Sequence, residues 1–294
     1  MSTNRSEGGT HRTGVAPKVL SIAGVDPSGG AGIFADLKAF SALGAYGCGV
    51  VCALTAQNTQ AVTGIAGVEP AFVRQQLDTL FADIAIVSGK IGMLGTAPIA
   101  VAVAEGLAAP IGAGELVHLV LDPVMVAKSG DHLLESAAIS MLREAVLPLA
   151  TVLTPNLPEA GVLLAARPPE TVAEMRRAAE KLRRLMADDG DRWVLVKGGH
   201  LDGDPIDLLH DGDRMIELGA TRVATRHTHG TGCTLSAAIA ALAPQRASVP
   251  DAVADAKRYL GLAIAAADSL SISRHATGHG PVHHFHHWWG RQRP

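Results

Sequence analysis

Short runs of apolar residues alternate along the chain with longer segments in which apolar residues recur every three or four positions. The runs predict strands at residues 19–23, 45–54, 83–88, 116–121, 151–153 and 193–196. The periodic segments predict helices at residues 33–43, 70–81, 97–107, 171–186 and 251–270, with one more ending near residue 147. Residues 207–210 and 215–218 flank an Asp-Gly turn and predict a β-hairpin. This alternation predicts an α/β fold with a doubly wound, mainly parallel central sheet.

The pattern contains no internal repeat and no compositional break typical of a linker, so we expect one domain over residues 17–294. Residues 1–16 are polar and rich in glycine, and they lack the apolar centre of a secretory signal. We interpret this segment as a disordered leader. No run of about 18 uncharged apolar residues predicts a membrane span.

Composition narrows the class of protein. Of the 294 residues, 48% are hydrophobic and 18% are charged, which is enough for a sizeable core. The formal net charge is −3, and the basic residues of the 171–186 helix lie largely off its apolar stripe, so we expect a solvated face and no nucleic-acid partner. Cys48, Cys52 and Cys233 form an odd set without a disulfide spacing, which indicates a reducing compartment.

One stretch, residues 227–242, joins a glycine turn to an apolar helix. At Gly230, Thr231 and Gly232 the backbone N–H groups can approach an anion, and the start of the helix adds unpaired donors and a partial positive charge. Cys233 lies in the first turn, where the same field favours a thiolate. The alternative is a glycine turn before a core helix, in which Cys233 only packs and caps.

Several polar side chains follow predicted strands: Gln57, Asp122, Asn156 and Glu159. Ligands of open α/β sheets bind at the carboxyl ends of the strands, so we expect these side chains to share the edge of one site. The amide of Gln57 is both a donor and an acceptor and suits the edge of a heterocycle. Lys197, followed by two glycines, is placed to reach a phosphate, or it belongs only to a turn.

The loop at residues 26–32 connects the first strand to the first helix and is rich in glycine. It has neither the G-x-G-x-x-G of a dinucleotide site nor the G-K-[ST] of a P-loop. It therefore favours a small wrapped substrate over a dinucleotide-dependent oxidoreductase. For Asp36 and Lys38 on the following helix, a solvated face is the alternative to a role in the site. Four histidines at residues 283–287 suggest a metal site, but no carboxylate or cysteine accompanies them.

Several motifs occur together in an order typical of one family. They are DPSGGAG at 26–32 with ADLK at 35–38, AQNT at 56–59, KIGML at 90–94, TPNLPEA at 154–160, KGGH at 197–200, HGTGC at 229–233 and GPVHHFH at 280–286. This set resembles the hydroxymethylpyrimidine and phosphomethylpyrimidine kinases of thiamine biosynthesis, which have a ribokinase-like, three-layer α/β/α fold. The resemblance runs from Val19 to Trp289, and its tail segment favours packing over metal binding for the histidines.

The resemblance implies ATP-dependent phosphorylation of 4-amino-5-hydroxymethyl-2-methylpyrimidine to its monophosphate and then to its diphosphate. It also implies Mg²⁺, a cytoplasmic location and a homodimer. By position, the substrate would bind to Gln57, Gly24, Asp36, Met93 and Val124. ATP would bind to Lys197, Asn156 and Thr231, and the metal to Glu159. The catalytic group would consist of Lys197, Gly230, Gly232 and Cys233, with Cys233 nearest the reacting group.

Two positions depart from the family pattern. Phe34 stands where glutamine is frequent, and Thr55 stands where valine is common. Because Thr55 adjoins Gln57, the pocket is expected to differ in detail there.

Related sugar kinases of this fold carry aspartate at the position of Cys233, and we offer a hypothesis for the difference. The first step must deprotonate an alcohol, whereas the second uses a phosphate oxygen that is already ionised near neutral pH, because its second pKa is about 6. A fixed carboxylate would repel that phosphomonoester. A thiol can be charged in one step and neutral in the other.

Two alternatives to the pyrimidine kinase stay open. A pyridoxal kinase has a related pocket and is compatible with Cys233, although the surroundings of Gln57 and Met93 favour the pyrimidine. A catalytically silent, pyrimidine-binding regulator of the same fold would be expected to have lost Lys197, Glu159 or the glycine turn, and all of these are present.

Overall fold

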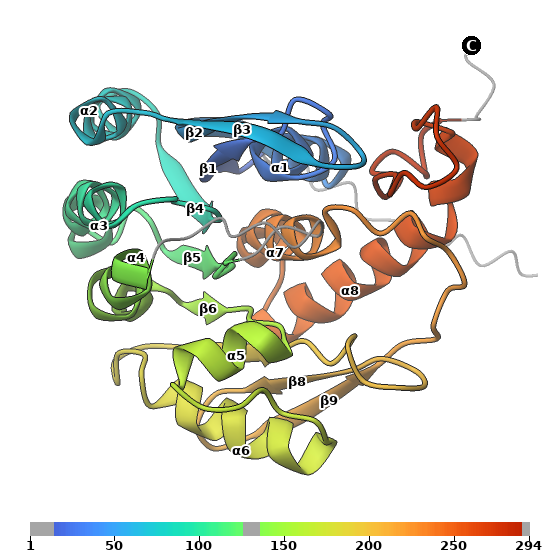
Figure 1. Cartoon of the computed structure of the whole chain (residues 1–294). Coiled ribbons are helices and arrows are strands. Elements are labelled where there is room, and N and C mark those ends of the chain that lie inside the picture. Colours follow the sequence, from blue (N-terminus) through green and yellow to red (C-terminus); the bar gives the residue numbers. More distant parts are fainter. Residues whose placement is uncertain (1–14, 126–135, 290–294) are drawn as a thin grey trace, which may run out of the picture.

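The computed structural model describes residues 15–125 and 136–289, which are built around one nine-stranded sheet (Figure 1). Its strands are β1 (Lys18–Val25), β2 (Tyr46–Gln57), β3 (Val62–Gly67), β4 (Ile86–Ile91), β5 (His118–Leu121), β6 (Val152–Leu153), β7 (Trp193–Val196), β8 (Ile206–His210) and β9 (Met215–Gly219). Most of the leader predicted at 1–16, and the segment around Lys128, lie outside the described residues.

The helices lie on both sides of this sheet (Figure 1). They are α1 (Gly32–Ala42), α2 (Pro70–Phe81), α3 (Ala97–Gly112), α4 (Ser136–Met141), α5 (Leu157–Leu163), α6 (Val172–Arg183), α7 (Thr231–Leu242) and α8 (Val249–Ala265). A π-turn at Leu142–Val146 and a 3-10 turn at Leu147–Leu149 continue α4. None of the helices described here is long and apolar enough to cross a membrane.

The order of the strands places a ligand site beside β1. The sheet runs β3-β2-β1-β4-β5-β6-β7-β8-β9, with β2 and β4 parallel to β1 on its two sides. The chain therefore leaves β1 toward one side of the sheet and later returns on the other. Such a point, where the strand order reverses, opens a crevice at the carboxyl ends of the strands. Among the strands described, the antiparallel pairs are β2–β3, β7–β8 and β8–β9, and the other neighbours pair parallel.

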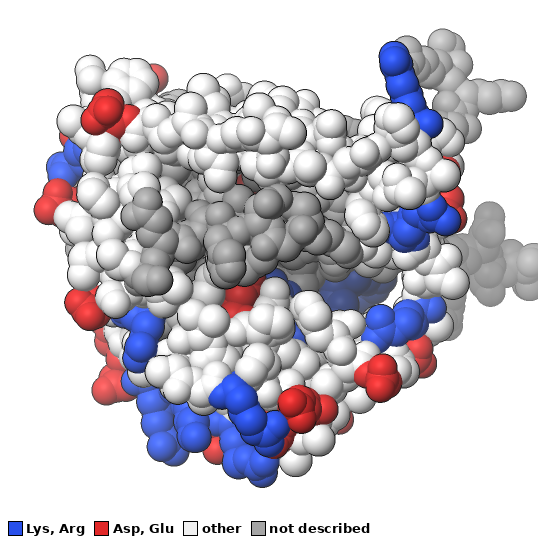
Figure 2. All heavy atoms as spheres, in the orientation of Figure 1, with Lys and Arg blue, Asp and Glu red and all other residues white. Residues whose placement is uncertain are grey.

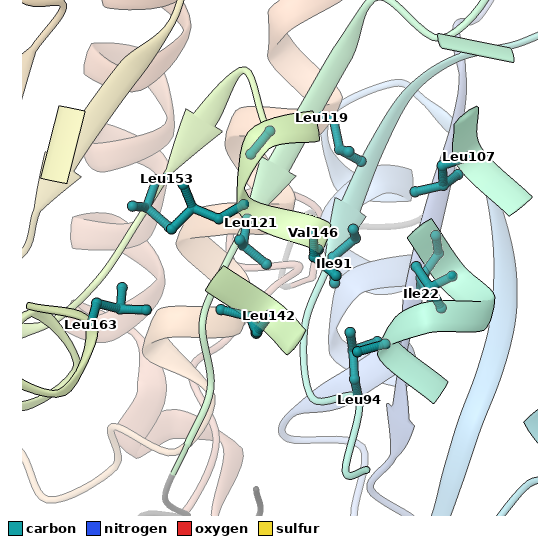
Figure 3. Packing of buried hydrophobic residues seen from close by; sticks show 14 of the residues in the cluster. Ile22, Ile91, Leu94, Leu107, Leu119, Leu121, Leu142, Val146, Leu153 and Leu163 are labelled. Atoms are coloured by element: carbon teal, nitrogen blue, oxygen red, sulfur yellow. The ribbon is translucent and has the colours of Figure 1, made fainter. Parts of the chain in front are cut away.

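Alternate residues of the buried strands supply two separate cores. Ile22, Leu119 and Leu121 face one side, where they pack with α2 to α6 and the turns after α4 (Figure 3). Val19, Val120 and Val152 face the other side, where they pack with α1, α7 and α8. Strands that are buried on both faces have continuous apolar runs without polar alternation. The sequence pattern therefore located these strands but did not show which side of the sheet each residue faces. The predicted three-layer α/β/α fold is confirmed.

The carboxyl-terminal tail packs against the helices of the second core. The Nε2 atom of His284 lies 3.0 Å from the Thr234 Oγ1 on α7, and the Tyr259 hydroxyl of α8 donates to the His284 carbonyl at 2.8 Å. Phe285 stacks on Trp289 with ring centroids 5.7 Å apart. Burial lowers the pKa of His284 to about 3, so its imidazole is neutral. The packing role expected for the tail is confirmed by these contacts.

Candidate active site

A cavity of about 560 Å³ lies at the carboxyl ends of the parallel strands, beside the start of α7. Figure 2 shows the molecule hollowed near its centre, with acidic and basic side chains visible inside the hollow. All the predicted site residues except Asp36 line the cavity: Gly24, Gln57, Met93, Val124, Asn156, Glu159, Lys197, Gly230, Thr231, Gly232 and Cys233. The expectation that polar residues after the strands share one site is therefore confirmed.

The start of α7 is built on a glycine that no other residue can replace without strain. Gly230 precedes the helix with φ +72°, and a Cβ atom on it would lie 1.7 Å from the carbonyl oxygen of Gly30. The loop at residues 26–32 is thus packed directly against the turn at residues 228–232. Gly232 and Cys233 are in the first turn of α7, where their N–H groups have no acceptor within the helix.

A hydrogen bond between the Asp26 carboxylate and the His229 imidazole joins these two loops. The Asp26 Oδ2 atom lies 2.7 Å from the His229 Nε2 atom and also accepts from the Ala31 N–H at 3.0 Å. The Ser28 N–H donates to the other carboxylate oxygen at 2.8 Å. Burial by itself would raise the pKa of Asp26, but the bonds from His229 and Ser28 outweigh it and hold the pKa below its usual value. The carboxylate therefore stays charged and keeps the loops together.

Beside the start of α7, Lys197 lies between two carboxylates. Its Nζ atom donates to the Asp122 Oδ1 at 2.9 Å and lies 4.0 Å from the Glu159 Oε2. Asp122 also accepts from the hydroxyls of Thr154 and Ser236, at 3.2 and 3.3 Å. Burial opposes the charge of Asp122, yet Lys197 and then Lys90 lower its pKa overall. Lys197 is thus held as a cation at the cavity, with its stem anchored at the end of β7.

Asn156 and Glu159 form a capping box at the start of α5. The Asn156 Oδ1 accepts from the Glu159 N–H at 2.9 Å, and the Glu159 Oε2 accepts from the Asn156 N–H at 2.8 Å. Burial, opposed by Lys197, raises the pKa of Glu159 to about 7. Its carboxylate is a hard oxygen ligand at the cavity wall. Mg²⁺ is usually held by one or two carboxylates together with phosphate oxygens, so the residues present fit this metal.

The Cys233 thiol lies on the cavity wall, but its protonation state is opposite to the one expected. Burial raises its pKa to about 11, against the opposing charge of Lys90. The Gly32 N–H is hydrogen bonded to the sulfur and favours the thiolate, without reversing the direction. The prediction of a stabilised thiolate is therefore wrong for the unliganded protein. Loss of solvation outweighs the field at the start of the helix.

Asp36 is placed behind the cavity and not on its wall. Its side chain is fully buried, and it accepts from the Ser21 hydroxyl at 2.6 Å and from the Lys90 ammonium at 2.9 Å. The alternative of a solvated face is therefore wrong for Asp36, and the substrate contact stays a prediction that its full burial does not favour. Helix periodicity indicated the element correctly, but the partner that pulls the carboxylate inward comes from β4, 54 residues away.

Gln57, Thr55 and Met93 also line the cavity. The Thr55 hydroxyl lies 3.1 Å from the Gln57 Oε1 and 3.0 Å from the Val25 carbonyl oxygen, so this departure from the family pattern adds a polar contact to the amide. The side chain of Met93 lies against Gly24, where a Cβ atom would be 2.4 Å from the methionine methyl carbon. Gly24 therefore leaves the space that Met93 fills.

Sequence reasoning missed the roles of Lys90, Asp26 and His229. The strand predicted at residues 83–88 is β4, which continues to Ile91. Lys90 is therefore a strand residue and not part of a loop. A lysine within an apolar run was the available signal for a buried cation. The pairing of Asp26 with His229 joins residues 203 positions apart, and no local pattern could have indicated it.

Solved structures of the same architecture are small-molecule kinases. The pyridoxal kinase from Staphylococcus aureus in complex with AMP-PCP and pyridoxal is 31% identical, with a TM-score of 0.81, and the match covers 94% of this chain and 96% of that one. The phosphomethylpyrimidine kinase from Clostridium difficile is 36% identical, with a TM-score of 0.71, over 83% of this chain and 97% of that one. The fold and the site thus define a ribokinase-like kinase.

Sequence comparison identifies the family within that class. A family model described as phosphomethylpyrimidine kinase matches residues 26–283. The hydroxymethylpyrimidine/phosphomethylpyrimidine kinase of Escherichia coli is 51% identical over 92% of this chain and 98% of its own length. The enzyme of that name from Rhizobium meliloti is 50% identical over 92% of this chain and 97% of its own. The chain belongs to the phosphomethylpyrimidine kinase family.

Proposed function

We propose that this protein uses ATP to phosphorylate 4-amino-5-hydroxymethyl-2-methylpyrimidine, first to the monophosphate and then to the diphosphate, in thiamine biosynthesis. One observation carries the proposal: a single cavity is lined by Gln57, by Lys197 with Glu159, and by the turn at residues 230–233. These supply an amide for a heterocycle, a cation for phosphates and an anion-binding helix start in one enclosure. The names of the relatives from Escherichia coli and Rhizobium meliloti support the same activity.

In the proposed complex, the pyrimidine ring lies near Gln57, with Gly24, Met93 and Val124 around it. The Gln57 amide can donate to a ring nitrogen and accept from an exocyclic amino group. The contact from Thr55 limits the rotation of that amide. The substrate's hydroxymethyl group is then directed toward the start of α7.

At the phosphate end, Lys197, Asn156 and Thr231 would contact ATP. Glu159 would hold Mg²⁺, which when bound neutralises charge on the phosphates of ATP. Phosphoryl transfer depends mainly on position and on stabilising negative charge. The N–H groups of Gly232 and Cys233 would donate hydrogen bonds to the transferring group and so stabilise the negative charge that develops on it.

In the first step, the oxygen of the hydroxymethyl group bonds to the γ-phosphorus while the bond from that phosphorus to the ADP oxygen breaks. The Cys233 thiol first gives its own proton to solvent water, and the hydroxyl proton then passes to the resulting thiolate sulfur. In the second step a phosphate oxygen attacks and has no proton to lose near neutral pH. The neutral thiol of the unliganded protein suits that second step.

The experiment is incubation with ATP, Mg²⁺ and the hydroxymethylpyrimidine, and separately with pyridoxal, followed by mass spectrometry of the products. We expect pyrimidine monophosphate first and diphosphate later. Lys197→Met should abolish both products, and Lys181→Met, on the exposed face of α6, should abolish neither. Monophosphate without diphosphate would restrict the activity to the first step. No product from either acceptor would favour a silent binding protein and overturn the proposal.

Pyridoxal kinase is the second candidate function. The supporting observation is the similarity to the Staphylococcus aureus pyridoxal kinase that was solved with pyridoxal. The outcome that selects it is pyridoxal phosphate as the only product. Formation of both products would establish a kinase with two acceptors.

We further propose one kinase domain over residues 17–294, acting as a cytoplasmic homodimer. Its three cysteines are free thiols, which supports a reducing compartment. The edge strand β3 has the sequence VTGIAG, without charge, and most of its residues are exposed. An uncharged open edge favours pairing with another chain, which supports a second copy as the partner.

A further inference from the structure

Lys90 is a cation with no solvent access at the base of the candidate active site. Its side chain is fully buried, and its Nζ atom lies 2.9 and 3.1 Å from the two carboxylate oxygens of Asp36. Lys90 borders the cavity, whereas Asp36 lies behind it and is also bonded to Ser21. Burial alone would lower the pKa of Lys90, but the charge of Asp36 holds it above its usual value, so the ammonium is permanent.

Stability alone does not account for this pair. Removing two charges from water costs several kcal/mol, and apolar residues of similar volume often serve a core as well or better. The Lys90 and Asp36 pair lies beneath a reacting site and not in a remote part of the core.

On β4, the Ser88 hydroxyl donates to the Ala240 carbonyl of α7 at 2.7 Å, and Lys90, two residues further along the strand, lies on the same face of the sheet. Lys90 and Cys233, in the first turn of α7, line the same cavity. Four charged side chains act on this sulfur: Lys90 and Lys197 favour its thiolate, whereas Asp36 and Asp122 oppose it. Lys197 is already bonded to Asp122 at 2.9 Å and lies toward Glu159. The partner of Lys90, Asp36, lies behind the cavity and not on its wall, so the charge of Lys90 is available to the sulfur.

We propose that Lys90 is a positioning residue that supplies the fixed positive charge for the Cys233 thiolate, and that Asp36 holds Lys90 in place and limits the strength of that charge. This inference rests on the proposed function for its catalytic consequence. In the first phosphorylation the thiolate takes the hydroxyl proton and becomes a thiol, while the new oxygen–phosphorus bond forms and ADP leaves. Lys90 neither gains nor loses a proton and does not touch the substrate.

The test is the alkylation rate of Cys233 by iodoacetamide in the ligand-free protein, because only the thiolate reacts. Peptide mapping by mass spectrometry separates Cys233 from the buried Cys48 and Cys52. Below the thiol pKa, each unit of increase in that pKa slows the reaction about tenfold. We expect Lys90→Met to slow alkylation by about tenfold or more, and Asp36→Asn to accelerate it by about threefold.

Changes of the alkylation rate in opposite directions in the two variants distinguish this role from a structural one, since general damage to the pocket would expose the thiol and accelerate alkylation in both. Lys181→Met is the matched control for loss of a lysine at an exposed position, and it should leave the rate unchanged. Thermal unfolding of each variant checks that it is folded. Equal rates in wild type and Lys90→Met, or changes of the same sign in both variants, would overturn the proposal.

A single substitution in a buried pair can prevent folding, so the double variant Lys90→Met with Asp36→Leu replaces both charges by apolar groups of similar size. We expect its alkylation rate to fall between those of Lys90→Met and wild type, and a rate equal to wild type would refute the inference. The readout needs no substrate. If wild type makes no phosphorylated pyrimidine but alkylation is slower in Lys90→Met and faster in Asp36→Asn, only the proposed function fails. If wild type is an active kinase but the two variants do not change the alkylation rate in these opposite directions, only this inference fails.

Discussion

At the scale of single residues, the chemistry of the site depends on when Cys233 loses its proton. Burial raises the pKa of the thiol to about 11, so the resting sulfur is neutral. A neutral thiol does not repel a phosphomonoester, whereas a carboxylate would. The hypothesis that cysteine serves a protein with two different acceptors is therefore kept, with a neutral starting state in place of the thiolate first expected.

We predict that Cys233→Ala slows the first phosphorylation by about a hundredfold or more, the usual contribution of a general base, and slows the second much less. Cys233→Asp should selectively harm the second step. The measurement is the rate of each step, started separately from the hydroxymethylpyrimidine and from its monophosphate. Cys48→Ala, which removes a thiol in the sheet core, should not change the ratio of the two rates. Equal losses in both steps for both Cys233 variants would exclude the hypothesis.

His284 gives a second prediction at this scale. Its folded-state pKa is about 3, below the value of 6.5 expected when unfolded, so the unfolded chain binds the additional proton between these values. The stabilisation is complete above pH 6.5 and is lost as the pH falls toward 3. As the pH falls from 6.5 to about 5, protonation of His284 in the unfolded chain should lower the free energy of unfolding by about 2 kcal/mol.

Urea unfolding followed by tryptophan fluorescence, near pH 7 and near pH 5, measures that loss. His284→Asn retains groups that can bond to Thr234 but cannot become charged, so its stability should depend less on pH. His275→Asn, at an exposed position, is the control and should behave as wild type. If His284→Asn loses as much stability on acidification as wild type, the buried neutral imidazole is not the cause.

At the scale of the element, the function of α7 depends on the turn that precedes it. Gly230 and Gly114 have nearly the same backbone conformation, with φ of +72° and +71°. A Cβ atom on Gly230 would lie 1.7 Å from the Gly30 oxygen, whereas one on Gly114 would meet nothing within 4 Å. The two positions therefore separate the cost of left-handed backbone from the cost of disturbing the contact between the loops.

We predict that Gly114→Ala loses about 1 to 2 kcal/mol of unfolding free energy, the cost of a left-handed conformation, and keeps its activity. Gly230→Ala should lose more stability, because the loop at residues 26–32 must also move. It should also slow both phosphorylation steps by about a hundredfold, since the N–H donors of the first turn are displaced. Urea unfolding and steady-state kinetics test both variants. Full activity in Gly230→Ala would show that the turn does not position those donors.

At the scale of the whole molecule, the open edge of the sheet at β3 bears on the oligomeric state. Ile65 is 51% exposed on this uncharged strand, and Val117, before β5, is similarly exposed at 55%. A lysine on an edge strand opposes pairing with another chain. If β3 meets a second copy, a charge at Ile65 should therefore act on assembly and a charge at Val117 should not.

We predict that wild type sediments as a dimer, that Ile65→Lys shifts it toward monomer, and that Val117→Lys leaves it unchanged. Sedimentation velocity at several protein concentrations measures the shift. A monomeric wild type would contradict the proposed homodimer directly. Dissociation by Val117→Lys in place of Ile65→Lys would place the interface elsewhere.

The alternation of apolar runs and helical periods determined most of the elements, the fold class and the general place of the site, but it did not predict β3 or α5. The prediction for β7 at residues 193–196 matches the structure, and α2 is correct at both ends. Both signals are local, because strand and helix periods repeat within a few residues. Gln57, Asn156 and Glu159 could be placed at one edge because parallel strands end on the same side of a sheet.

Only the tertiary structure decided which polar and charged side chains meet and whether buried groups such as the Cys233 thiol are protonated. Lys90 reaches Asp36 from another strand, and His229 reaches Asp26 across 203 residues. The pKa of Cys233 also depends on distant parts of the chain. The local helix start favours a thiolate, but burial by distant segments raises the pKa more strongly. Desolvation and charge pairing depend on everything that surrounds a group, and that environment is assembled from residues far apart in the chain.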